Sequence, residues 1–196
     1  IAFPGEDEDE FFRLDLYNTL DNLGMYWHVP NIQAFHSIVP NSIMEFYPYV
    51  GVKRDVSSKP EVNNYALRPL LSVKYLAVSQ SEKDAENLMP GYTFSFSQFG
   101  YDFYENENYL PMGFGYTTGV LDTAPLSLRA NVMLEAVGLS EEAMERNADI
   151  LTELESIDYA SLNASGMEEA VEERRQYTCD TFAFDKTGFT ATCDLD

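Results

Sequence analysis

The sequence has few of the residues on which enzyme sites are usually built. It contains two cysteines, one tryptophan and two histidines in 196 residues. The histidines, His28 and His36, have a spacing that fits no compact metal-ligand motif. The GxSxG, P-loop, GxGxxG and HExxH patterns are all missing. The residues alone therefore predict no catalytic residue, no metal site and no cofactor.

Basic residues are also scarce. Lys and Arg number 12 against 33 Asp and Glu, so the formal net charge is −21. Such a field repels nucleic-acid phosphates and anionic lipid headgroups within a Debye length of about 8 Å. Nucleic acid is therefore excluded as a partner, and the simplest role of the acidic surface is solubility.

Long apolar runs are absent too. No stretch of about 18 apolar residues occurs, so this chain is not expected to cross a membrane by itself. It has no signal peptide and begins at Ile1 rather than Met, which predicts a piece of a longer protein. Hydrophobic residues make up 45% of the chain and aromatic residues 14%, a composition typical of a folded domain with a core.

The order of strand-like and helix-like segments predicts an α+β (mixed α/β) fold. We expect a central, mainly antiparallel sheet, a helical lobe and a C-terminal hairpin. The predicted organisation is an acidic linker over residues 1–10 and a single extracytoplasmic domain over 11–196, divided into a sheet-rich core (11–120), a helical lobe (121–175) and a hairpin (176–196) that is truncated at its end.

Local patterns place the elements within this plan. Alternation predicts strands at 11–17, 92–97, 101–105 and 113–118, with Phe94 and Phe96 on one face of the 92–97 strand. Residues 72–79 are apolar on both faces, which predicts a strand covered on both sides. Residues 18–30 are expected to form a loop. Capping patterns predict helices that begin at Ser42 and stop near Tyr47, cover 123–137, run from Ser140 to about residue 154, and begin at Ser165. The closing hairpin is expected to turn at 185–188.

Aromatic and acidic clusters supply the candidate sites. Tyr26, Trp27, Tyr47 and Tyr49 could stack on sugar faces, or they could fill the core. Trp27 is the strongest candidate because it lies in the expected loop. A second cluster, Asp102, Glu105 and Glu107, could pair carboxylates as in a glycosidase, although solvated surface charge is the simpler explanation in so acidic a chain.

Two cysteines lie on the arms of the closing hairpin. A three-residue loop with Gly188 in a bulge position would leave Cys179 and Cys193 diagonal to each other. A disulfide between them requires an oxidising compartment. The sequence leaves open whether they are bonded.

Four blocks of sequence, in this order and spacing, resemble one family. They are residues 34–47 (AFHSIVPNSIMEFY), 54–60 (RDVSSKP), 68–76 (RPLLSVKYL) and 104–113 (YENENYLPMG). Together they resemble the YfhO family of bacterial multi-spanning membrane proteins. The stretch 123–137, with Glu145-Arg146-Asn147, is similar to clostridial-type members.

The resemblance implies a parent protein that is a GT-C-type glycosyltransferase. Such an enzyme takes a sugar from a polyprenyl-phosphate donor and modifies cell-envelope polymers, here lipoteichoic acid of Gram-positive bacteria. Its catalytic carboxylate lies in an early loop between membrane helices, outside this chain. The resemblance thus implies a non-catalytic domain on the extracytoplasmic face of the bacterial cell membrane, joined to the transmembrane portion of the same protein.

Three roles follow as hypotheses for such a domain. The first is binding of a cell-envelope glycopolymer or lipid-linked sugar, or covering of the active site, by a groove near Trp27, His28, His36 and Arg68. The second is a structural or protein-interaction module of the cell envelope with no ligand of its own. The third and weakest is an independent secreted hydrolase.

Overall fold

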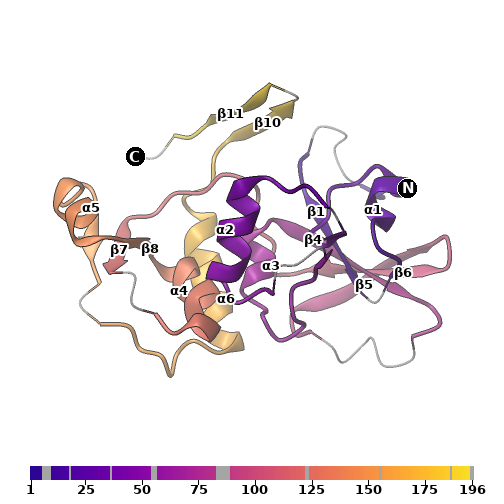
Figure 1. Ribbon diagram of the computed structural model, residues 1–196, viewed down its shortest axis with the longest axis horizontal. Coiled ribbons are helices and arrows are strands. Elements are labelled where there is room, and N and C mark those ends of the chain that lie inside the picture. The colour runs from indigo at the N-terminus through magenta and orange to yellow at the C-terminus, as the bar shows by residue number, and fades with distance from the viewer. Residues whose placement is uncertain are drawn as a thin grey trace.

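A computed structural model describes residues 1–5, 10–17, 19–35, 37–53, 57–82, 89–121, 124–154, 156–185 and 187–194. Figure 1 shows a four-stranded sheet at one end of the molecule, helices in the middle and a small three-stranded sheet at the other end. A two-stranded hairpin at the C-terminal end of the chain projects from this body. The predicted mixed fold class, with its mainly antiparallel sheet, helical lobe and closing hairpin, is confirmed.

The main sheet has the strand order β1-β4-β6-β5. Its strands are β1 (Arg13–Tyr17), β4 (Val73–Ser79), β6 (Tyr101–Asn106) and β5 (Tyr92–Gln98). The β1–β4 pair is parallel and the other two pairs are antiparallel. The central strand β4 is buried along most of its length, as its apolar sequence on both faces predicts.

One prediction for this sheet is wrong. A register shift in β5 between Phe94 and Phe96 pairs Phe94 with Tyr104 and Phe96 with Phe103. Because successive residues of β6 point to opposite faces, the two phenylalanines also lie on opposite faces. Phe96 stacks on Phe103 with ring centroids 4.6 Å apart, whereas Phe94 is 59% exposed. A bulge of this kind leaves no mark in the alternation of the sequence.

Four of the helices gather around an apolar core. The helices in the described part of the chain are α1 (Leu23–Trp27), α2 (Asn41–Tyr49), α3 (Leu67–Leu70), α4 (Arg129–Glu135), which follows a 3-10 turn (Leu126–Leu128), α5 (Glu141–Arg146) and α6 (Ala164–Arg175). Helices α2, α3, α4 and α6 share this core, with Val50, Leu67, Leu134 and Val171 at its centre. The middle of the molecule in Figure 1 is this helical lobe.

Several helix boundaries differ from the predictions. Helix α2 begins at Asn41 rather than Ser42 and continues through Pro48 to Tyr49. Pro48 removes the hydrogen bond that its N–H would donate to the Met44 carbonyl, but the last turn still closes because the Val50 N–H donates to the Phe46 carbonyl at 3.0 Å. Helix α6 begins at Ala164, before the expected cap at Ser165, and the side chain of Asn163 accepts a hydrogen bond from the Gly166 N–H at 3.3 Å.

The expected helices at 123–137 and 140–154 are shorter than predicted. The first ends at Glu135, and the second ends at Arg146 although its Ser140 cap forms as predicted. Residues at the end of the expected helices, or just after it, form two strands instead. These strands are β8 (Val137–Leu139) and β9 (Thr152–Glu153), which pair in parallel with β7 (Thr118–Leu121). These pairings join segments that are distant in sequence and too short to show a periodic pattern. Thr123 lies outside the described residues.

The remaining strands are short or peripheral. Strands β2 (Ala34–Phe35) and β3 (Ser57–Ser58) form a two-residue ladder. Strands β10 (Thr181–Asp185) and β11 (Gly188–Thr192) form the closing hairpin, in which Asp185 pairs with Gly188. A disulfide joins Cys179 to Cys193 and so answers the question that the sequence leaves open.

The segment expected to be a third meander strand, 113–118, instead anchors the hairpin. Phe114 forms an isolated antiparallel bridge with Thr178. The Cys179 N–H donates to the Gly113 carbonyl at 2.9 Å. Gly113 has a φ of +87°, and a Cβ there would lie 3.0 Å from the Cys179 Sγ, so this glycine lets the backbone pass close to the disulfide.

The N-terminal segment is partly built into the core. Phe3, which the sequence places in the linker, packs against Phe12 and Tyr75 with centroids 5.0 and 5.2 Å away. The acidic residues 6–9 of that linker lie outside the described residues. Across the described part of the chain, no helix combines the length and apolar character needed to cross a bilayer.

Candidate functional site

The two faces of the main sheet differ in chemistry because strand residues alternate. Leu14 and Leu16 of β1 point to one face, where they join an aromatic cluster with Tyr75 and Phe103. Asp15 points to the opposite face, where it is 1% exposed. Each face carries one candidate site: a cavity on the apolar face and a buried ion pair on the opposite face.

A cavity of about 460 Å³ lies beside α1, on the apolar face. It is lined by three short segments of chain: Ile1, Ala2 and Phe3; Glu10, Phe11 and Phe12; and Trp27, His28, Val29 and Pro30. This volume falls within the range typical of small-molecule sites, and most of the residues that line it are apolar, with Glu10 and His28 as the polar ones.

Trp27 and His28 end the short helix α1 at the wall of this cavity. The Trp27 ring meets Tyr101 edge-on at 5.0 Å and lies 6.0 Å from Phe103, so one side of the indole is fixed by the sheet. His28 is exposed and takes a left-handed conformation with φ 56°, from which its N–H donates to the Met25 carbonyl. The expected loop is therefore a helical turn that holds Trp27 rigidly, while His28 remains accessible.

Glu10 supplies the carboxylate of the cavity wall. It pairs with Lys74, with 2.8 Å between Nζ and Oε2, and it accepts a hydrogen bond from the Tyr109 hydroxyl at 3.2 Å. Lys74 also lies over the rings of Phe12 and Tyr109, 5.7 and 5.2 Å from their centroids. This carboxylate is thus held by the protein's own cation.

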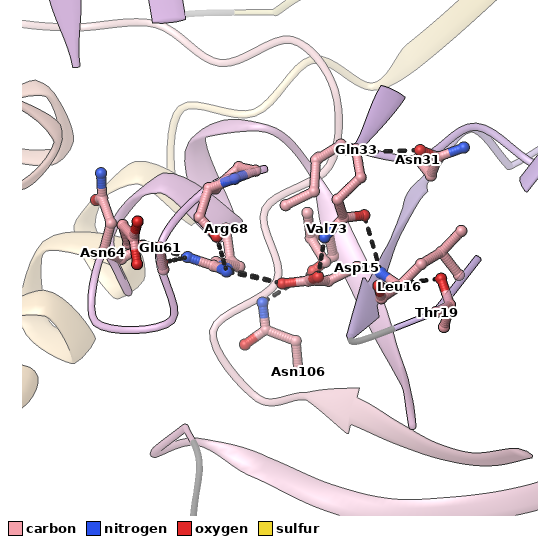
Figure 2. A network of polar contacts seen from close by, with 12 residues as sticks. Asp15, Leu16, Thr19, Asn31, Gln33, Glu61, Asn64, Arg68, Val73 and Asn106 are labelled. Atoms are coloured by element: carbon pink, nitrogen blue, oxygen red, sulfur yellow. Dashed lines mark hydrogen bonds and ion pairs between the residues drawn. The ribbon is translucent and has the colours of Figure 1, made fainter. Parts of the chain in front are cut away.

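The opposite face holds a buried ion pair between Asp15 and Arg68 (Figure 2). The Arg68 Nε and Nη2 atoms lie 3.0 and 2.9 Å from Asp15 Oδ2, and the Gln33 amide donates to Oδ1. Arg68 Nη1 donates to the carbonyls of Glu61 and Asn64 at 2.6 and 2.8 Å. Nearly all hydrogen-bonding capacity of this arginine is therefore used inside the protein.

Two tyrosines border this ion pair. Burial raises the pKa of Tyr47 to about 12, and its hydroxyl donates to the Ile32 carbonyl at 2.7 Å. The pKa of Tyr92 is raised well above its ordinary value, first by burial and then by the charge of Asp15. Among the described residues, the buried Tyr92 hydroxyl has no hydrogen-bond partner.

The structure brings together only part of the predicted groove. Trp27 and His28 line one cavity, whereas Arg68 is buried on the other face of the sheet at 2% exposure. Arg68 therefore cannot share a groove with Trp27 in this structure, and His36 lies outside the described residues. Ligand binding by Trp27 and His28 stays a prediction.

The other sequence candidates are also dispersed. Tyr47 and Tyr49 lie in the helical core rather than beside Trp27. Asp102 and Glu105 are three positions apart in β6 and so point to opposite faces, which argues against the carboxylate pair that the sequence left possible. Asp102 accepts hydrogen bonds from Gln80 and Ser97. Over the described ranges, no three His, Cys, Asp or Glu side chains are grouped to hold a metal ion.

Sequence reasoning missed two features of these sites. Glu10, Phe11 and Phe12 line the cavity, and the only hint was their position directly before the first strand. The second is Asp15, because the alternation that predicts a strand at 11–17 does not show when a polar side chain of that strand faces a buried partner.

Comparison with known proteins gives one match. Residues 4–190 match the family described as bacterial membrane protein YfhO. Nothing matches among curated proteins or among solved structures. Since the match spans most of the 196 residues, the chain belongs to the YfhO family of bacterial membrane proteins.

Proposed function

We propose that this chain is an extracytoplasmic part of its membrane protein and binds a cell-envelope glycopolymer, of the lipoteichoic acid type, at the Trp27–His28 cavity. The observation that carries the proposal is the cavity itself, where a rigidly held indole and an exposed imidazole share one wall. The flat face of an indole stacks on the apolar face of a sugar ring, and an imidazole can hydrogen-bond to its hydroxyl groups.

The proposed location is supported by the hairpin disulfide. Bonds such as Cys179–Cys193 persist in oxidising compartments and are rare in the cytosol. A domain of a bacterial membrane protein that carries one is better suited to the outer side of the membrane.

The proposed reaction belongs to the parent protein rather than to this chain. By its resemblance, that protein is a GT-C-type glycosyltransferase with a polyprenyl-phosphate sugar donor. The cavity would then hold the acceptor polymer or the lipid-linked sugar, or cover the active site, while the catalytic carboxylate lies elsewhere in the protein.

The test is a titration of the isolated chain with teichoic-acid fragments while following fluorescence of Trp27, its single tryptophan. His28→Gly is the informative variant, because glycine accepts the left-handed conformation and so removes the imidazole without backbone strain. We expect a shift of Trp27 emission in the wild type and an affinity about threefold to tenfold weaker in the variant, the loss of one hydrogen bond.

Phe99→Gly is the matched control. It makes the same kind of substitution at another exposed residue in a left-handed conformation, with φ 52°, which is not one of the residues that line the cavity. This variant should bind like the wild type. A flat titration of the wild type at millimolar ligand would contradict the proposal.

A structural or protein-interaction role is the second candidate, and the hairpin favours it. Phe184 and Phe189, paired across β10 and β11, are 65% and 71% exposed. If the role of the chain is contact through this face alone, replacing both phenylalanines with serine would disrupt its packing against the transmembrane portion of the same protein. The Trp27 titration would be unchanged.

A further inference from the structure

The described side chains that line the Trp27 cavity offer very little positive charge. Among the described residues that line it, His28 is the one whose side chain can become cationic. Phosphate groups are bound in proteins mainly by Arg and Lys side chains or by clustered backbone N–H groups, which form charge-assisted hydrogen bonds. The lining described above has no arginine or lysine for this purpose.

The nearest cations behind the wall are already engaged. Lys74 pairs with Glu10. Arg13 donates to the Leu71 carbonyl at 2.9 Å, and its guanidinium lies over the Phe11 ring, 4.9 Å from the centroid. Both cations therefore stabilise the wall from within instead of facing the cavity.

The electrostatic field of the whole chain also disfavours a negatively charged ligand. With a net charge of −21, the surface repels an approaching anion over a range of about 8 Å at physiological salt. An uncharged pyranose ring meets no such barrier, and its C–H face matches the aromatic wall. In a polymer with alternating sugars and phosphates, the sugars would therefore strengthen binding and the phosphates would weaken it.

We infer that the cavity takes an uncharged sugar ring, so that a glycopolymer or lipid-linked sugar is held there by its sugar and not by its phosphate. The inference rests on the proposed binding role and adds the chemical class of the ligand. It also explains how so acidic a domain can bind a phosphate-rich polymer. The acidic surface repels the phosphate backbone, while the cavity binds the sugar attached to it.

Three probes separate these chemistries in the Trp27 titration: a neutral N-acetylglucosamine trimer, a glycerol phosphate oligomer without sugar, and the same oligomer carrying N-acetylglucosamine. Each is measured at about 0.05 M and about 0.5 M salt, where the Debye length changes about threefold. We expect the Kd of the trimer to change less than about twofold with salt. The sugar-bearing oligomer should bind more tightly at high salt, and the bare oligomer should not bind.

The outcomes distinguish this inference from the function on which it rests. Equal binding of bare and sugar-bearing oligomers, or an affinity that falls as salt rises through counterion release, overturns the inference and leaves the binding role intact. A response to none of the probes overturns both.

A charge variant gives an independent reading. Glu10→Gln removes the carboxylate from the cavity wall, so it should lower the preference for the neutral trimer over the sugar-bearing oligomer by about twofold or more at low salt. Glu142→Gln changes the net charge equally but lies on α5, remote from the cavity, and should leave that preference unchanged. Equal effects of the two variants would show that the local carboxylate does not select the ligand.

Discussion

Arg68 shows at the scale of one residue why an arginine that the sequence predicts in a ligand groove need not face a ligand. Its guanidinium is shared between Asp15 and the carbonyls of residues 61 and 64, so it ties β1 to the segment that leads into α3. Removing one partner of a buried pair strands the other charge in the protein interior. The role that these contacts assign to Arg68 is to hold the sheet against the helical lobe.

Arg68→Met is therefore expected to lower the free energy of unfolding by about 3–5 kcal/mol, because Asp15 is left without its counter-charge. Urea denaturation followed by circular dichroism measures the change. The double variant Asp15→Asn/Arg68→Met should recover a large part of the loss, since no buried charge remains. A single variant as stable as the wild type would rule out this role for the ion pair.

Tyr92 is expected to behave in the opposite way. Its buried hydroxyl makes no hydrogen bond to any described residue, so Tyr92→Phe should be neutral or stabilise the fold by up to about 1 kcal/mol. Tyr47→Phe is the matched control, because that hydroxyl donates to the Ile32 carbonyl and its loss should cost about 1 kcal/mol. Thermal unfolding of the two variants decides the prediction: similar losses would mean that the Tyr92 hydroxyl has a partner after all.

At the scale of elements, the disulfide decides how firmly the closing hairpin is held. Cys179 and Cys193 close a loop with a sequence separation of 14 residues, for which the chain-entropy model gives about 3 kcal/mol. Two-stranded hairpins are marginal by themselves, and Phe182 and Phe184 contact the body of the molecule through Phe11, with centroids 5.8 and 6.0 Å away.

The variant Cys179→Ser/Cys193→Ser should therefore release the hairpin before the rest unfolds. We expect faster hydrogen exchange of backbone amides in 181–192 and little change in β4 and β6. Reductant added to the wild type should reproduce this pattern and should have no effect on the variant. Unchanged exchange in the hairpin would show that Phe11 and the bridge between Phe114 and Thr178 hold it without the disulfide.

Elements that depend on neighbouring residues could be predicted, and those that depend on distant pairing could not. The Ser140 cap and the closing hairpin follow from local capping and turn chemistry, and both occur as expected. The parallel sheet β8-β7-β9 joins three short segments, and nothing local marks them as partners. The same limit applies to the site: Trp27 and His28 are neighbours in sequence and share a cavity, whereas Arg68 is fixed by Asp15, 53 positions away.

At the scale of the whole molecule, the excess of 33 acidic over 12 basic residues sets how stability responds to pH. Acidic side chains also lie close together where they are partly buried. Glu135 at the end of α4 shares a cavity of about 260 Å³ with Glu169 and Glu173. Burial raises the pKa of Glu135, and the nearby charges of Glu173 and Asp158 raise it further. Self-repulsion of this kind opposes the compact state at neutral pH.

Glu135→Gln is expected to stabilise the protein at pH 7. A carboxyl whose pKa is higher in the folded than in the unfolded state binds its proton more tightly when folded, so stability falls as pH rises from the ordinary value of 4.5 through the folded value. The substitution removes this loss, and its benefit should disappear at about pH 4, where both states are protonated. Urea unfolding at the two pH values measures the difference.

Glu142→Gln in the first turn of α5 is the control and should not stabilise, because an acidic side chain there favours the helix. A benefit of Glu135→Gln that persists unchanged at pH 4 would assign the effect to packing rather than to charge.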